Sequence, residues 1–312
     1  MSTARAKLKK VFAVCKYIYT PLIFACIFYY IFKNSDLLLD LFSKAKPQFI
    51  ISAVVLWASL HLLAPLSPLL ILRCLGYSLP YKRLLEIYIA RLPARYLPGG
   101  IWHTVGRLAD YRSCGITKKH ISFLAFFETI FPIPVTFFIG GTLLWIYTPR
   151  ALPYSLEIFS TVASFIVLFA PFFLLIWNPL KKYPPAKNTF FYLNLLFLSF
   201  IFWSLAASSF IFYFNSVALN KTAQQPLLSL AGAYIFSWGT GYIAIFAPQG
   251  IGIFEVTAGK IINLPLSLGS SVAFLAGFRL IALLADFLIY VSFWLNNFWF
   301  KKDPFNKDNP NT

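Results

Sequence analysis

The stretch RLPARYLPGGIWHTVGR, from Arg91 to Arg107, concentrates side chains that could bind a negatively charged group. Pro-Gly-Gly at its centre interrupts a helix, because proline lacks a backbone donor and glycine tolerates irregular backbone. The amide groups at the start of a helix that follows such a break attract an anion. We therefore predict a binding site for an anionic group here. Its candidate residues are the cations, the aromatic side chain and the backbone of the break: Arg91, Arg95, Pro98, Gly99, Gly100, Trp102, His103 and Arg107.

A second, weaker break has the sequence APQGIGIFE, from Ala247 to Glu255. Aligning Pro98 with Pro248 places PGGIW over PQGIG, and each break is followed by a loop and a long apolar segment. Two related units of opposite orientation are typical of secondary transporters, so the alignment favours an inverted repeat. The alternative is a chance similarity between two Pro/Gly pieces. The candidate substrate-binding residues of the second break are Pro248, Gln249, Gly250, Gly252 and Glu255.

Three ionisable residues, Glu128, Arg279 and Asp286, lie inside otherwise apolar segments. Charge is costly there and usually faces a partner or a cavity, so all three are candidate substrate-binding residues. With one residue inserted, the alignment places Glu128 opposite Arg279, and we predict that these two form an ion pair. Arg279 and Asp286 are seven residues apart, which puts them on one helix face. The predicted pair could serve helix packing alone, or it could line a route for a substrate.

The composition is that of a membrane protein with several spanning helices. The 312 residues are 59% hydrophobic and 12% charged, whereas soluble domains carry about 25% charged residues. The net charge of +17 does not indicate nucleic acid, because Lys and Arg cluster between apolar segments as the positive-inside rule describes. The cysteines have no metal-binding spacing, and we predict that they are free thiols. They are Cys15, Cys26, Cys74 and Cys114.

Six apolar segments are long enough to cross about 30 Å of hydrocarbon. They are Val11–Phe32, Gln48–Leu72, Ile121–Tyr147, Leu156–Trp177, Thr189–Phe214 and Leu268–Leu295. Leu84–Leu97 is too short to cross, so we predict that it is re-entrant or interfacial. Pro226–Phe246 is long enough to cross, but the second break follows it, and the charge bias given below favours a re-entrant segment. Prolines are expected to kink the second and third spans, at Pro65, Pro68, Pro132 and Pro134. His61 is expected to pack against a neighbouring helix or a water rather than to bind a ligand.

The positions of Lys and Arg predict the orientation in the membrane. With the N-terminus inside, cytoplasmic regions hold roughly three times as many Lys and Arg as outer loops. This bias requires Pro226–Ile262 to enter and leave from the outer side, because a full crossing would place the basic tail outside. We expect one all-α integral membrane domain over residues 1–300, with halves 1–180 and 181–300. A polar tail over 301–312 and the N-terminus would both be cytoplasmic.

Nothing in the sequence has the pattern of an enzyme active site. There are only three histidines, and no HExxH, GxSxG or Walker A motif and no carboxylate pair of the DxD type. We therefore expect no catalytic activity, no metal and no cofactor. The alternative is an integral membrane transferase that uses His103.

Four pieces of the sequence resemble the membrane domain of bacterial lysylphosphatidylglycerol synthase/flippase and its stand-alone relatives. They are RYLPGGIWHTVGR, LAFFETI with Glu128, APQGIGIFE, and FLAGFRLIALLAD. The resemblance covers most of the chain from the second span to the last. The second break departs from the family pattern, with Gln249 where Gly is usual and Phe254 where Arg is frequent.

The resemblance implies a flippase-like protein of the bacterial plasma (inner) membrane that moves an anionic or lipid-linked substrate between leaflets. Phospholipids, glycolipids and polyprenyl-phosphate-linked sugars are the substrate classes it suggests, in envelope biogenesis. Lysyl transfer is not expected, because the family's synthase domain is soluble and only about a dozen polar residues follow Phe300. The alternative is an accessory membrane subunit that holds an envelope-biosynthesis enzyme such as a glycosyltransferase or lipid synthase.

Overall fold

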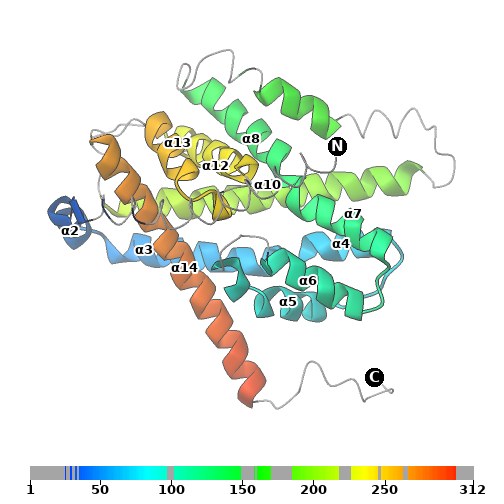
Figure 1. Cartoon of the computed structure of the whole chain (residues 1–312). Helices are drawn as coiled ribbons and strands as arrows, with labels where there is room; N and C mark the ends of the chain where they lie inside the picture. The colour runs from blue at the N-terminus through cyan, green and yellow to red at the C-terminus, as the bar shows by residue number, and fades with distance from the viewer. Residues whose placement is uncertain are drawn as a thin grey trace, which may run out of the picture.

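A computed structural model describes residues 35–96, 102–148, 160–169, 185–217, 226–244, 247–262 and 266–299, with a few isolated positions elsewhere. Every regular element within these ranges is a helix (Figure 1). The elements are α2 (Ser35–Ser43), α3 (Pro47–Leu63), α4 (Leu66–Cys74), α5 (Tyr81–Ala90), η1 (Pro93–Tyr96), α6 (Trp102–Ser113), α7 (Lys118–Thr129), α8 (Pro132–Tyr147), α10 (Pro185–Ser216), α12 (Leu227–Ile243), η2 (Pro248–Gly250), α13 (Ile253–Ile262) and α14 (Leu268–Trp299). The predicted span Val11–Phe32 and most of Leu156–Trp177 lie outside the described residues.

Four helical stretches are long and apolar enough to cross a membrane. They are Pro47–Cys74, Lys118–Tyr147, Phe190–Ser216 and Gly269–Leu295. Each agrees within a few residues with a span predicted from hydropathy. Many large apolar side chains on these helices are exposed, among them Phe197, Leu280 and Phe287, which water would penalise and lipid would not. The chain is an all-α protein of the membrane class.

Prolines divide two of the spans where the sequence predicts kinks. α3 ends at Leu63 and α4 begins at Leu66, with Pro65 between them. α7 ends at Thr129 and α8 begins at Pro132. Proline removes a backbone donor and its ring displaces the preceding turn, so the helix axis is interrupted at each position. The interruptions at Pro65 and Pro132 agree with the prediction, whereas Pro68 and Pro134 lie inside α4 and α8.

The core lies where α10, α12 and α14 meet, and it is rich in buried aromatic rings. The ring of Phe210 stacks on that of Tyr234, with centroids 5.0 Å apart, and Phe278 meets both edge-on. α8 packs closely along α12 because Gly140 lets the two backbones approach. A Cβ at Gly140 would lie 2.5 Å from the backbone nitrogen of Phe236. Small residues at such crossings are typical of helix packing in membranes.

In the sequence, the first Pro/Gly break falls between η1 and α6, and the second falls between α12 and α13. One helix near each break, α5 for the first and α13 for the second, contacts α14 (Figure 1). α12 has 17 residues, or about 25 Å at 1.5 Å per residue.

Cys74 and Cys114 are free thiols, as predicted, whereas Cys15 and Cys26 lie outside the described residues.

Candidate functional site

The carboxylate of Asp286, on α14, is the acceptor for four side chains from two other parts of the chain. Its Oδ1 accepts a hydrogen bond of 3.1 Å from Nε1 of Trp57 and lies 2.8 Å from Nε2 of His61, both on α3. Its Oδ2 accepts from Nη1 of Arg95 at 3.0 Å and from the hydroxyl of Tyr96 at 2.8 Å. Asp286 is only 3% exposed. A carboxylate so deeply buried requires this many donors.

The residues around Asp286 are positioned by simple features of their helices. Trp57 and His61 are four residues apart, so they project from one face of α3. η1 follows α5 and presents Arg95 and Tyr96 together. Burial lowers the pKa of Arg95, but the Asp286 carboxylate and the tyrosines around it together raise it by more, so Arg95 stays charged. Burial and the same carboxylate raise the pKa of Tyr96, which keeps its hydroxyl a donor.

Arg279 lies seven residues before Asp286 on α14 and binds residues of the second break. Its Nε forms an ion pair with Oε1 of the fully buried Glu255, and its Nη2 donates to the backbone oxygen of Gln249 at 3.2 Å. The other oxygen of Glu255 accepts the backbone N–H of Gly252 at 2.7 Å. The guanidinium also lies over the rings of Trp238 and Phe254. Arg279 and Asp286 therefore serve one network, as their spacing predicts.

The second break contacts η1, the turn that precedes the first break in the sequence. Nε2 of Gln249, in η2, donates a hydrogen bond of 2.7 Å to the backbone oxygen of Arg95, in η1. Gln249 has a φ of 51°, in the left-handed region that glycine adopts most easily. Gln249 keeps this backbone while its side chain binds η1.

A third ion pair joins the short helix after the first break to the next long helix. Nη2 of Arg107, on α6, lies 3.1 Å from Oε2 of Glu128, on α7, and both side chains are buried. The geometry is not that of a directed hydrogen bond. Among the described residues, neither carboxylate oxygen of Glu128 has a hydrogen-bond partner, and Nε of Arg107 has none either. Arg107 also lies over the ring of Tyr88, 5.3 Å from its centroid.

The predicted ion pair between Glu128 and Arg279 is wrong. Each binds instead a residue of the short helix that follows its own break: Glu128 binds Arg107, and Arg279 binds Glu255. An alignment of two segments shows which positions correspond, but it does not show that the corresponding residues contact each other. The two pairs have the same arrangement with the charges exchanged.

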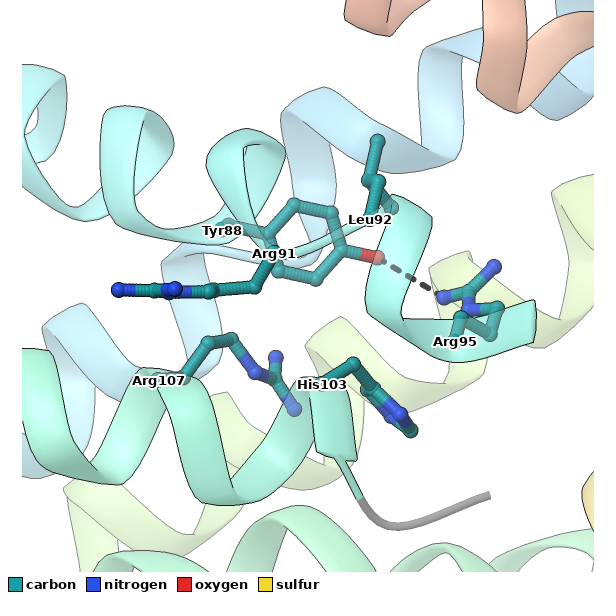
Figure 2. Close-up of a pocket in the computed structure, with 6 residues that line it drawn as sticks. All are labelled: Tyr88, Arg91, Leu92, Arg95, His103 and Arg107. Atoms are coloured by element: carbon teal, nitrogen blue, oxygen red, sulfur yellow. Dashed lines mark hydrogen bonds between the residues drawn. The ribbon is translucent and has the colours of Figure 1, made fainter. Parts of the chain in front are cut away.

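A small pocket opens beside the first break, and we call it the arginine pocket. It is lined by Tyr88, Arg91, Leu92, Arg95, His103 and Arg107. In Figure 2 the side chains of Arg107 and His103 lie across from Tyr88, and a hydrogen bond joins Arg95 to the Tyr88 hydroxyl. Arg91 makes two hydrogen bonds of 2.7 Å to the carboxylate of Asp110. These bonds raise the pKa of Arg91.

The structure gathers most of the predicted site residues that it describes. Arg91, Arg95, His103 and Arg107 line the arginine pocket, but Trp102 is half exposed and does not line it. Gly250 and Gly252 both have positive φ and turn the chain at the second break, where Pro248 begins η2. The predicted residues Pro98, Gly99 and Gly100 lie outside the described residues.

Sequence reasoning missed four residues of the network. They are Trp57, His61, Tyr88 and Tyr96. His61 packs against a neighbouring helix as predicted, but its contact there is the buried carboxylate of Asp286. The available signal was the pair Trp57 and His61, two polar-tipped side chains on one face of an apolar helix. Tyr88 and Tyr96 gave no comparable signal.

Within the described ranges, no three His, Cys, Asp or Glu side chains gather in a way that could hold a metal ion. The chain matches no protein-family model and no curated protein.

Proposed function

We propose that this chain is a flippase-like membrane protein that binds an anionic or lipid-linked molecule and moves it between leaflets. One observation carries the proposal: η2, at the second Pro/Gly break, contacts η1, the turn just before the first, and Asp286 and Arg279 of α14 bind both turns. The resemblance to the membrane domain of lysylphosphatidylglycerol synthase points to the same function.

The physical argument starts from the cost of such an arrangement. Irregular backbone at membrane depth is tolerated only where protein or a wet cavity surrounds it. Buried charges there are costly and usually line a pathway or pair with one another. Here Arg95, Arg107 and Arg279 lie along the two breaks, each held by a carboxylate. A negatively charged headgroup is the ligand that this arrangement favours.

The proposal includes two units of opposite orientation, 1–180 and 181–300, with six spans, two re-entrant segments and both termini cytoplasmic. The exchanged ion pairs support this symmetry, since each joins a short helix after a break to the next long helix. The excess of Lys and Arg on one side supports the orientation. In this arrangement one break opens to the cytoplasm and the other to the outside. Alternating access needs such a geometry.

Leaflet exchange in reconstituted vesicles tests this function. We expect vesicles with the full chain to move at least one fluorescent phospholipid or polyprenyl-phosphate lipid faster than protein-free vesicles. The double variant Arg95→Gln/Asp286→Asn removes a buried pair and should slow exchange at least about tenfold. Its matched control, Asp40→Asn/Lys44→Gln, removes the exposed pair on α2 and should exchange at the wild-type rate.

An exchange rate equal to that of protein-free vesicles for every anionic and lipid-linked class would contradict the proposal. Co-purification of a stoichiometric biosynthetic enzyme in that case would favour an accessory subunit. Loss of function by His103→Ala, with a folded protein and without any lipid exchange, would favour a transferase.

A further inference from the structure

The arginine pocket is built from three arginines that approach it from three elements. Arg91 follows α5, Arg95 lies in η1 and Arg107 lies in α6. Among the residues that the structure describes, no carboxylate lines the pocket. The carboxylate partners of the three arginines belong to Asp110 on α6, Asp286 on α14 and Glu128 on α7. Each guanidinium is thus paired with a carboxylate that is not part of the pocket lining. Figure 2 shows the Arg91 guanidinium extending away from the other lining side chains.

One donor in this pocket lacks a partner. Arg107 is only 9% exposed, and its Nε makes no hydrogen bond to any residue that the structure describes. The buried oxygens of Glu128 beside it also make none. Leaving buried donors and acceptors unsatisfied is costly, and native proteins do so mainly where a ligand, an ion or a water completes the site.

We propose that the arginine pocket binds a phosphate group, either of a lipid headgroup or of free phosphate. A planar guanidinium offers paired donors that match phosphate oxygens. Three guanidiniums from three directions suit a tetrahedral anion better than a planar carboxylate. The pocket has room for about one water molecule, so a phosphate group binds only when the side chains that line the pocket move apart, and the rest of a headgroup stays outside. This inference rests on the proposed function only for the lipid source of the phosphate.

The same geometry predicts a competition within the site. Arg107 contacts Glu128 through Nη2 at 3.1 Å and is also one of the residues that line the pocket. A bound phosphate satisfies Nε of Arg107 and competes with the Glu128 carboxylate for the same cation. Binding would therefore weaken the contact between α6 and α7. That contact is the first unit's counterpart of the pair between Glu255 and Arg279.

Ligand binding to the purified full chain in detergent tests the proposal. The probes are inorganic phosphate, dihexanoyl phosphatidic acid, dihexanoyl phosphatidylglycerol and, as the phosphate-free analogue, dihexanoylglycerol. The double variant Arg107→Gln/Glu128→Gln removes the cation without leaving a buried charge unpaired. Its Kd for the phosphate-bearing probes should rise about ten- to a hundredfold, the usual effect of losing a charge-assisted contact. Arg112→Gln changes an exposed arginine of the same helix, and its Kd should stay within about twofold.

Each outcome decides the proposal or the source of the phosphate. Competition by inorganic phosphate at the same concentrations as the lipids supports a free phosphate, and binding of the lipids alone supports a headgroup. An unchanged Kd in the folded double variant, or equal affinity for dihexanoylglycerol, would contradict phosphate binding in the arginine pocket. Leaflet exchange that persists in such a protein would leave the proposed function standing. Tight phosphate binding without exchange of any lipid would instead refute the function and keep the pocket.

Discussion

Asp286→Ala is expected to lower the free energy of unfolding by about 3 kcal/mol, the low end of the cost of breaking a buried ion pair. The carboxylate accepts from Trp57, Arg95 and Tyr96 and contacts His61. Its removal leaves the Arg95 guanidinium charged and without its anion. The value lies at the low end because the Arg95 side chain is 21% exposed, which lets water screen part of the charge. Titration with SDS in mixed micelles measures the loss.

The matched control is Asp40→Ala, which removes the carboxylate of the exposed pair with Lys44 on α2. Exposed pairs contribute about 0–1 kcal/mol, so this variant should unfold almost like the wild type. Asp286→Asn keeps the shape and one acceptor oxygen and should fall between the two alanine variants. If Asp286→Ala lowered the free energy of unfolding no more than Asp40→Ala does, the contact between α14 and η1 would not stabilise the fold.

Glu255→Ala should cost a similar amount, about 3 kcal/mol, through the second break. Glu255 is fully buried and binds both the Arg279 guanidinium and the backbone N–H of Gly252. Without it, Arg279 keeps only the Gln249 carbonyl and the two aromatic faces. Equilibrium unfolding in mixed micelles, compared with wild type, checks the expected loss.

A neutral pair separates the role of the charge from that of the shape. In Glu255→Gln/Arg279→Gln no buried charge is left unpaired, and the glutamine at 255 can still accept from Gly252. This double variant should recover at least half of the stability lost in Glu255→Ala. Glu86→Ala, which removes the partly buried partner of Arg83, is the control and should cost under about 1 kcal/mol. Equal losses in the double variant and in Glu255→Ala would argue against a charge effect.

The elements were the most predictable part of this molecule. Hydropathy is a local property, so the spans at Pro47–Cys74 and Gly269–Leu295 were found within a few residues. Proline acts on its own helix, so the kinks near Pro65 and Pro132 followed from the sequence as well. The clustering of Arg91, Arg95, His103 and Arg107 was also foreseen, because they are neighbours along the chain.

Partners across the structure were much harder to predict. Sequence alignment placed Glu128 opposite Arg279, but equivalence between two units carries no information on contact, and each charge found its partner nearby. The contact of Gln249 with Arg95 depends on how two distant breaks pack. His61 and Trp57 look like ordinary residues of an apolar helix until α14 brings Asp286 against them.

The central claim is that the two breaks form one site for the anionic group of a lipid. Native mass spectrometry of the full chain, extracted in mild detergent, tests it most directly. We expect a retained lipid that bears a phosphate group, enriched over its share of the membrane, and its loss in Arg107→Gln/Glu128→Gln but not in Arg112→Gln. Retained lipids that match the bulk membrane in wild type and in both variants would contradict the claim.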